Sequence, residues 1–181
     1  MDAFPPQMRR FVAAVSPEPT PLQREMAEVG RDQNFPILGP EAGGLALLFS
    51  RMVAAERVFE FGSGFGYSAT WFLRGLAPEG DIVLTEVDAD EIEMGREFLA
   101  RAGETERVTY EHGDALDTIE RYDGPFDVVL VDHQKHRYRE TFERVETKVA
   151  PGGVVLADNM MAGPFDFESV LAGLEGDTEG L

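Results

Sequence analysis

Two short acidic segments carry side chains of the kind that bind metal ions. Asp132 and Lys135 lie in the segment 129–138, VLVDHQKHRY, and Asp158 with Asn159 follow a second apolar run. Two carboxylates and an amide oxygen are hard donors that suit Mg²⁺ or another divalent cation. A lysine beside such a centre can act as a general base when burial lowers its pKa. Acidic residues at strand ends are also common helix caps, and that interpretation stays open.

A glycine-rich loop, EFGSGFGYS over residues 60–68, lies further upstream. Glycines between a strand and a helix let backbone N–H groups approach a ligand at the helix N-terminus. A phosphate-binding P-loop would end in Gly-Lys-Ser/Thr, and this loop has no lysine. The dinucleotide fingerprint G-x-G-x-x-G needs a glycine where Tyr67 stands. What remains is G-x-G-x-G preceded by Glu60, which is either a ligand loop or a tight structural turn.

Two further acidic residues follow the next apolar runs. Glu86 lies a little over twenty residues past Gly62, where a carboxylate can accept both hydroxyls of a ribose. Methyl donors and NAD share that requirement, so Glu86 does not separate them. Asp114, in the segment 112–115 (HGDA), can accept a hydrogen bond from an adenine amino group. It can also serve as a helix N-cap, and the two roles are compatible.

The elements that must position these residues alternate between strand and helix. The apolar runs predict strands at 57–61, 81–85, 107–111, 126–131 and 154–157. Helices are predicted between them at 67–76, 88–102 and 135–149. This pattern is typical of an α/β fold, a Rossmann-like, doubly wound, mostly parallel sheet with helices on both faces. Strands four and five should be neighbours, which would place Asp132, Asp158 and Asn159 at one edge of the sheet.

The chain is divided by its prolines into a leading segment and a main domain. Residues 1–38 are predicted to be an N-terminal helical segment that covers the site, with a helix over 22–33. Residues 39–181 form the main domain, which opens with a helix over 40–55 and offers a weak last helix over 167–174. A length of 181 residues suits one compact domain.

The charge balance excludes several classes of partner. Asp and Glu number 34 against 16 Lys and Arg, for a net charge of −18. Such a surface repels phosphate backbones and anionic lipid, so neither nucleic acid nor membrane is expected as a partner. A large acid excess with only two lysines resembles proteins of salt-loving archaea, the source we expect. With no cysteine, no basic-apolar leader and no apolar run of about 18 residues, the protein is expected to be soluble and cytoplasmic.

Four of these motifs, in this order, resemble one family. The pattern Asp-His-x-Lys-x-x-Tyr at 132–138 and Ala-Asp-Asn at 157–159 is similar to the metal-dependent O-methyltransferases, the group of catechol and caffeoyl-CoA O-methyltransferases. The loop 60–68 and Glu86 match the same family, and the resemblance covers about residues 39–163. It implies an enzyme that transfers the methyl group of S-adenosylmethionine, with Mg²⁺, to a hydroxyl of a small, aromatic, catechol-like acceptor.

The resemblance also implies a role for each motif residue. It makes Asp132, Asp158 and Asn159 the metal ligands and Lys135 the catalytic base. It assigns the binding of S-adenosylmethionine to Glu60, Gly62, Ser63, Gly64, Gly66, Ser68, Glu86, Val87, Asp114, Ala115, Asp132 and His133.

The sequence departs from the family at two places. Family members continue into a seven-stranded sheet, whereas this chain offers about five strands, so either it is truncated or one sheet edge is exposed. An unpaired edge invites association, and a homodimer is one expectation. Gln134 stands where the catechol enzyme carries an aromatic residue, which weakens the case for catechol itself.

Three other functions compete with the metal-dependent transferase. A metal-independent class I methyltransferase would use Asp132 and Asp158 only as caps. A cofactor-binding module would bind without turnover. A nicotinamide dehydrogenase is set aside by Tyr67 and by the Asp158-Asn159 pair.

Overall fold

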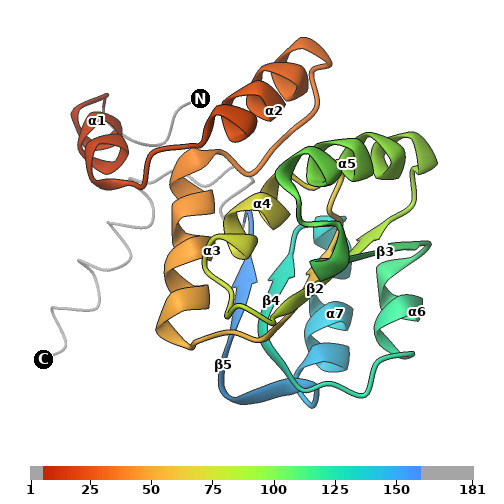
Figure 1. Cartoon of the computed structure of the whole chain (residues 1–181). Coiled ribbons are helices and arrows are strands. Elements are labelled where there is room, and N and C mark those ends of the chain that lie inside the picture. The colour runs from red at the N-terminus through yellow and green to blue at the C-terminus, as the bar shows by residue number, and fades with distance from the viewer. Residues whose placement is uncertain (1–5, 160–181) are drawn as a thin grey trace, which may run out of the picture.

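A computed structural model describes residues 6–159 of the chain (Figure 1). Its strands are β1 Arg57–Phe61, β2 Asp81–Glu86, β3 Val108–His112, β4 Phe126–Val131 and β5 Val149–Ala157. Its helices are α1 Pro6–Val15, α2 Pro21–Asp32, α3 Pro40–Met52, α4 Tyr67–Leu73, α5 Ala89–Ala102, α6 Ala115–Ile119 and α7 Tyr138–Val145. Two short 3₁₀ turns, η1 Thr105–Arg107 and η2 Lys135–Arg137, precede β3 and α7.

The five strands form one parallel sheet in the order β3-β2-β1-β4-β5. The chain therefore winds outward from β1 to β3, crosses back to β4, and winds outward again to β5. This confirms the predicted doubly wound sheet and the pairing of the fourth and fifth strands. The winding reverses between β1 and β4, and a crevice at such a point is where ligands bind in open α/β sheets.

Helices cover both faces of the sheet because its side chains alternate along each strand. On one face Val58, Ile82, Leu84, Val128 and Leu130 pack against α2, α3, α4 and α5. On the other face Phe59, Phe61, Val83, Val129 and Val131 pack against α6 and α7. Near-continuous apolar strands are explained by this double coverage.

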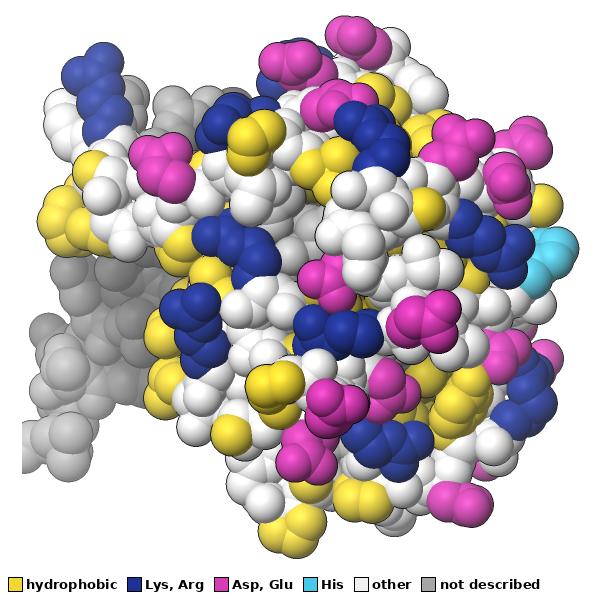
Figure 2. Space-filling model, viewed as in Figure 1, with side chains coloured by type: hydrophobic (Ala, Val, Ile, Leu, Met, Phe, Trp, Pro, Cys, Tyr) yellow, Lys and Arg dark blue, Asp and Glu magenta, His cyan; other side chains and the backbone are white. Residues whose placement is uncertain are grey.

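The surface carries acidic and basic side chains interspersed with apolar ones on the face in Figure 2. Several arginines form exposed ion pairs, such as Arg101 with Glu25 and Arg139 with Glu143. Exposed pairs of this kind contribute little stability each. Within residues 6–159 no helix has the length and apolar character needed to cross a bilayer.

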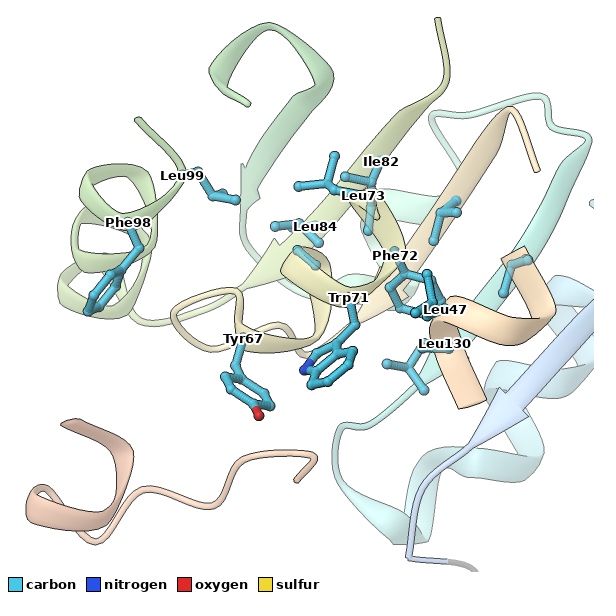
Figure 3. Close-up of a cluster of buried hydrophobic side chains, with 14 of the residues drawn as sticks. Leu47, Tyr67, Trp71, Phe72, Leu73, Ile82, Leu84, Phe98, Leu99 and Leu130 are labelled. Atoms are coloured by element: carbon cyan, nitrogen blue, oxygen red, sulfur yellow. The ribbon is translucent and has the colours of Figure 1, made fainter. Parts of the chain in front are cut away.

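The larger core cluster is built around Trp71 on α4. Its ring is fully buried and lies near the centre of the side chains in Figure 3, 6.4 Å from the ring of Tyr67. A glycine in α3 makes room for it, since a Cβ at Gly43 would come within 2.5 Å of the indole nitrogen. Trp71 and Phe72 are both fully buried core residues.

The N-terminal helices are attached to this core through α2. Thr20 and Gln23 form a capping box at the start of α2. The buried Gln23 side chain also donates to Thr70 Oγ1 at 3.0 Å and accepts from Arg74 at 2.8 Å. These contacts hold α2 over α4 and direct the following residues, 35–38, toward the carboxyl edge of the sheet.

The sequence placed three elements imperfectly. The helix predicted over 135–149 is the turn η2 followed by the shorter helix α7. Strand β5 begins at Val149 rather than at 154, because an irregularity opposite Phe126 lets the strand pass through Gly152 with a positive φ of 86°. The short helix α6 was not predicted. The helix predicted over 167–174 lies outside the described residues.

The charge excess predicts that salt stabilises the fold. At about 1 M salt the Debye length falls to about 3 Å, so repulsion within a chain of net charge −18 is screened. We expect the melting temperature to rise as KCl increases from about 0.1 to 2 M. Each kcal/mol that the screening adds to the free energy of unfolding raises the melting temperature by about 2–4 °C. Calorimetric melting at neutral pH measures this rise. A smaller rise is expected near pH 5, where carboxylates begin to take up protons, and a flat response at neutral pH would contradict the prediction.

Candidate functional site

A cavity of about 430 Å³ opens at the carboxyl edge of the sheet. The loops that follow β1, β2, β3, β4 and β5 all contribute to its wall. Every residue predicted for the cofactor, the metal ion or the base lines this cavity except Gly66, which caps α4 beside it. The structure thus brings the sequence-predicted residues together in one place.

Gly62 sets the distance between the two sides of the crevice. It has a positive φ of 82°, and a Cβ there would lie 2.7 Å from the carbonyl oxygen of Asp132. The loops after β1 and β4 therefore touch backbone to backbone, which only glycine allows. Asp132 N–H completes the junction by donating to Phe61 O at 2.9 Å.

Glu60 is a buried carboxylate on the apolar face of β1. It is 1% exposed, and Ser68 on α4 donates a hydrogen bond to its Oε1. No atom of the described residues donates to its other oxygen, Oε2. Burial raises the pKa of Glu60 to about 8, against the lowering effect of the Ser68 hydrogen bond. A buried acceptor without a donor is costly, so the position suits a ligand that brings N–H groups and positive charge.

Glu86 holds the turn at the end of β2. Its Oε2 accepts from Gly64 N at 2.9 Å, and its Oε1 accepts from Val87 N at 2.7 Å and Asp88 N at 3.0 Å. The carboxylate is therefore fixed against the glycine loop while lining the cavity. A carboxylate has about four lone-pair sites, so it can accept further hydrogen bonds. Its contact with a ribose stays a prediction.

Asp114 begins helix α6 and is paired with Arg137. Its carboxylate accepts from Leu116 N at 2.9 Å and Asp117 N at 3.4 Å, which confirms the N-cap. The Arg137 guanidinium donates to both of its oxygens and holds the pKa of Asp114 below its usual value. Arg137 lines the cavity but was not among the predicted residues.

Lys135, Asp132 and Tyr138 form a connected group in the segment that follows β4. Lys135 Nζ donates to Asp132 Oδ1 and to Tyr138 Oη, each at 2.8 Å, and Tyr138 Oη donates to the carbonyl of Asp158 at 3.0 Å. Burial acts to lower the pKa of Lys135, but these two hydrogen bonds outweigh it and raise the pKa. The expectation of a depressed lysine pKa is therefore wrong for this arrangement, because the lysine sits in an ion pair.

Asp132 and Asp158 lie close enough for the charge of one carboxylate to act on the other. Burial raises the pKa of Asp132, Lys135 opposes this, and the negative charge of Asp158 raises it further. Both aspartates and Asn159 line the same end of the cavity. Among the described residues no cluster of three or more His, Cys, Asp or Glu side chains forms a metal site, so a cation here would use two carboxylates, the amide and ligand oxygens.

His133 is held between two rings. It lies 5.6 Å from the ring of Phe61 and 5.6 Å from that of Tyr138, and its Nε2 lies 2.7 Å from Thr141 Oγ1. Since Thr141 Oγ1 donates to Arg137 O, we assign a proton to Nε2, which donates to Thr141. Burial lowers the pKa of His133, so the ring is neutral at pH 7 and forms a flat cavity wall.

Sequence reasoning missed the apolar wall. The residues 35–38, FPIL, line the cavity. The ring of Phe35 rests on Gly64, where a Cβ would come within 2.6 Å of it, and it lies 5.3 Å from the ring of Phe65. An apolar run between a helix end and Pro40, too short to be a strand, was the available signal.

The burial of Glu60 predicts a pH-dependent cost to stability. Its folded pKa of about 8 exceeds the ordinary glutamate value of 4.5, so between these values the folded state holds the extra proton. Stability conferred by that proton is lost as pH rises toward 8, by up to about 1.4 kcal/mol per pH unit. We expect Glu60→Gln to melt with the wild type near pH 5 and above it near pH 8. The control is Glu106→Gln at an exposed position, whose difference in melting temperature from the wild type should not change with pH. A difference for Glu60→Gln that is equally constant between pH 5 and pH 8 would contradict the prediction.

Comparison with known proteins identifies relatives of this chain. The family described as O-methyltransferase matches residues 18–166. A catechol O-methyltransferase from Niastella koreensis is 30% identical over 128 residues, which cover 68% of this chain and 58% of that protein. A catechol O-methyltransferase from Mycobacterium tuberculosis is 33% identical over 124 residues, which cover 68% of this chain and 56% of that protein.

A solved structure gives the same result. The O-methyltransferase TomG from Streptomyces achromogenes, involved in tomaymycin synthesis and crystallised with SAM, superposes with a TM-score of 0.77 at 28% identity. The match covers 94% of this chain and 88% of TomG. The chain spans less than two thirds of the length of the two catechol O-methyltransferases. Since the family match extends over most of its residues, the chain belongs to the O-methyltransferase family.

Proposed function

We propose that this chain binds S-adenosylmethionine in the cavity and transfers its methyl group to a hydroxyl of a small, catechol-like acceptor. The observation that carries the proposal is the buried Glu60, whose Oε2 lacks a donor among the described residues. The α-ammonium group of S-adenosylmethionine supplies both the N–H donors and the positive charge that this oxygen needs. Two relatives carry the name catechol O-methyltransferase, and TomG was solved with SAM, which supports the same ligand.

The rest of the cofactor follows the cavity wall. Gly62, Ser63, Gly64 and Ser68 would surround the methionine end, where backbone N–H groups are available. Glu86 with Val87 would hold the ribose, and Asp114 with Ala115 the adenine, while His133 offers a flat neutral face. In this order the sulfonium would lie between the glycine loop and Asp132.

The acceptor would lie between the apolar wall 35–38 and the polar group at Asp132. Asp132, Asp158 and Asn159 would hold a divalent cation, which lowers the pKa of a hydroxyl from about 10 for a phenol into the neutral range. Lys135 would take the hydroxyl proton on Nζ in its neutral form, which requires that the cation and the acceptor displace its ammonium group from the ion pair with Asp132. The acceptor oxygen then forms a bond to the methyl carbon as the carbon–sulfur bond breaks, and its electron pair stays on sulfur as a thioether. The residues supply alignment, because the sulfonium methyl is already activated.

A metal-independent methyltransferase is the second candidate. The observation that favours it is the ion pair between Lys135 and Asp132, which neutralises one carboxylate without a metal ion. In that case Asp132 would orient Lys135, and Asp158 would only shape the turn after β5.

Metal dependence separates the two candidates. Calorimetry should detect S-adenosylmethionine binding with or without a metal ion, and no NAD binding. Transfer of labelled methyl to catechol should require Mg²⁺, stop with a chelator, and resume with excess Mg²⁺. Transfer that survives chelation would support the metal-independent candidate, and a lack of S-adenosylmethionine binding would reject the proposal altogether.

Replacement of Lys135 tests the general base. Arginine keeps the positive charge but does not deprotonate, so Lys135→Arg should lower kcat by about 10²-fold or more while the Kd of S-adenosylmethionine stays near the wild-type value. Lys148 is the matched control, since it is the other lysine of the chain and donates to Tyr122 O at 2.7 Å, outside the cavity. Lys148→Arg should keep full activity. Equal kcat values for the two variants would rule out Lys135 as the base.

A further inference from the structure

Arg137 connects two loops that follow strands far apart in the sheet. Its guanidinium donates to both oxygens of Asp114, with the longer bond, Nη2 to Oδ1, at 3.3 Å. Asp114 follows β3 and Arg137 follows β4, and both β2 and β1 lie between these strands. Three strand spacings amount to roughly 14 Å, so the ion pair joins the loop of the edge strand β3 to the loop of β4, across the point where the winding reverses.

The ion pair is part of a longer chain of hydrogen bonds. At one end Asp114 caps α6. At the other end the carbonyl of Arg137 accepts from Thr141 Oγ1 at 3.0 Å, and this fully buried hydroxyl contacts His133 Nε2 at 2.7 Å. The connection runs from Asp114 through Arg137 and Thr141 to His133, next to Asp132. The side chains of the ion pair are 26% and 37% exposed, so it is only partly screened by solvent.

We propose that Arg137 is a positioning residue that couples the adenine end of the cavity to the segment presenting Lys135. The inference rests on the proposed function and extends it to a residue with no assigned role. The bidentate fork fixes direction as well as distance, so the turn at Asp114 and the segment 132–137 keep one relative placement. When the nucleoside binds at the turn of Asp114, the segment 132–137 is therefore already ordered. This order reduces the entropy lost on reaching the reactive arrangement.

Charge alone predicts the opposite effect on binding. S-adenosylmethionine carries a sulfonium, so removal of a nearby cation would strengthen its binding by relieving Coulomb repulsion. Loss of positioning weakens binding instead. It does so equally for S-adenosylhomocysteine, whose sulfur is neutral. The two ligands therefore separate a geometric role from an electrostatic one.

The test compares Arg137→Gln with Arg139→Gln. Arg139 lies two residues on, pairs with Glu143 on α7, has a side chain 92% exposed, and does not line the cavity. For Arg137→Gln we expect the Kd of both ligands to rise by about tenfold and kcat at saturating ligands to fall by about tenfold. Arg139→Gln should match the wild type, and Arg137→Lys, with one charge but no fork, should lie between.

Three results would overturn the inference: tighter binding of S-adenosylmethionine alone, a Kd and kcat equal to those of Arg139→Gln, or a Kd change with no change in kcat. If Arg137→Gln does not fold, Arg137→Lys is compared with Arg139→Gln instead. Wild-type Kd and kcat in Arg137→Lys would contradict a role for the two hydrogen bonds from the guanidinium to Asp114. Failure of the wild type to bind S-adenosylmethionine would instead reject the proposed function, so the two failures are distinguishable.

Discussion

The pairing of β1 with β4 determines where every group in the cavity lies. The two strands are neighbours in the sheet but are separated in the chain by β2 and β3, so the loops after them leave toward opposite sides of the crevice. The backbone contact between Gly62 and Asp132 brings the two loops together at the base of that crevice. A buried carboxylate on one side and an aspartate–lysine pair on the other can then act on a single ligand. The helices, the caps and the N-terminal wall all serve to preserve this separation.

The same arrangement explains the energetic cost of the site. Glu60 occupies a position on an apolar face where the strand pattern calls for a hydrophobic side chain, and its desolvation is offset only in part by Ser68. Asp132 is likewise partly buried beside Asp158. The fold tolerates these groups because two apolar clusters, one on each face of the sheet, stabilise the strands that carry them. These buried charges lower the free energy of unfolding of the unliganded protein, and a ligand that binds them can raise it again.

Much of the fold and most of the cavity wall could be predicted from the sequence. Periodicity and turn residues place β1 and β4 to the residue, because short apolar runs bounded by charges and glycines have few alternatives. The limits of β5 escaped prediction, since they depend on a register shift against β4 between Phe126 and Val128, which local sequence does not reveal. The roles of Phe35 and Arg137 arise from contacts with Gly64 and Asp114, which lie more than twenty residues away in the chain. The pKa of Lys135 depends in the same way on where Asp132 and Tyr138 place their oxygens.

The position of Trp71 gives this protein an internal optical reporter. It is the one tryptophan in the chain, and its indole is fully shielded from water between α3 and α4. Its neighbour Tyr67 contacts it on one side and lines the cavity on the other. Emission excited at the red edge of the protein absorption band therefore arises from a single known environment one side chain away from the ligand. Events at the glycine loop can be followed by fluorescence in the native chain, without an attached dye.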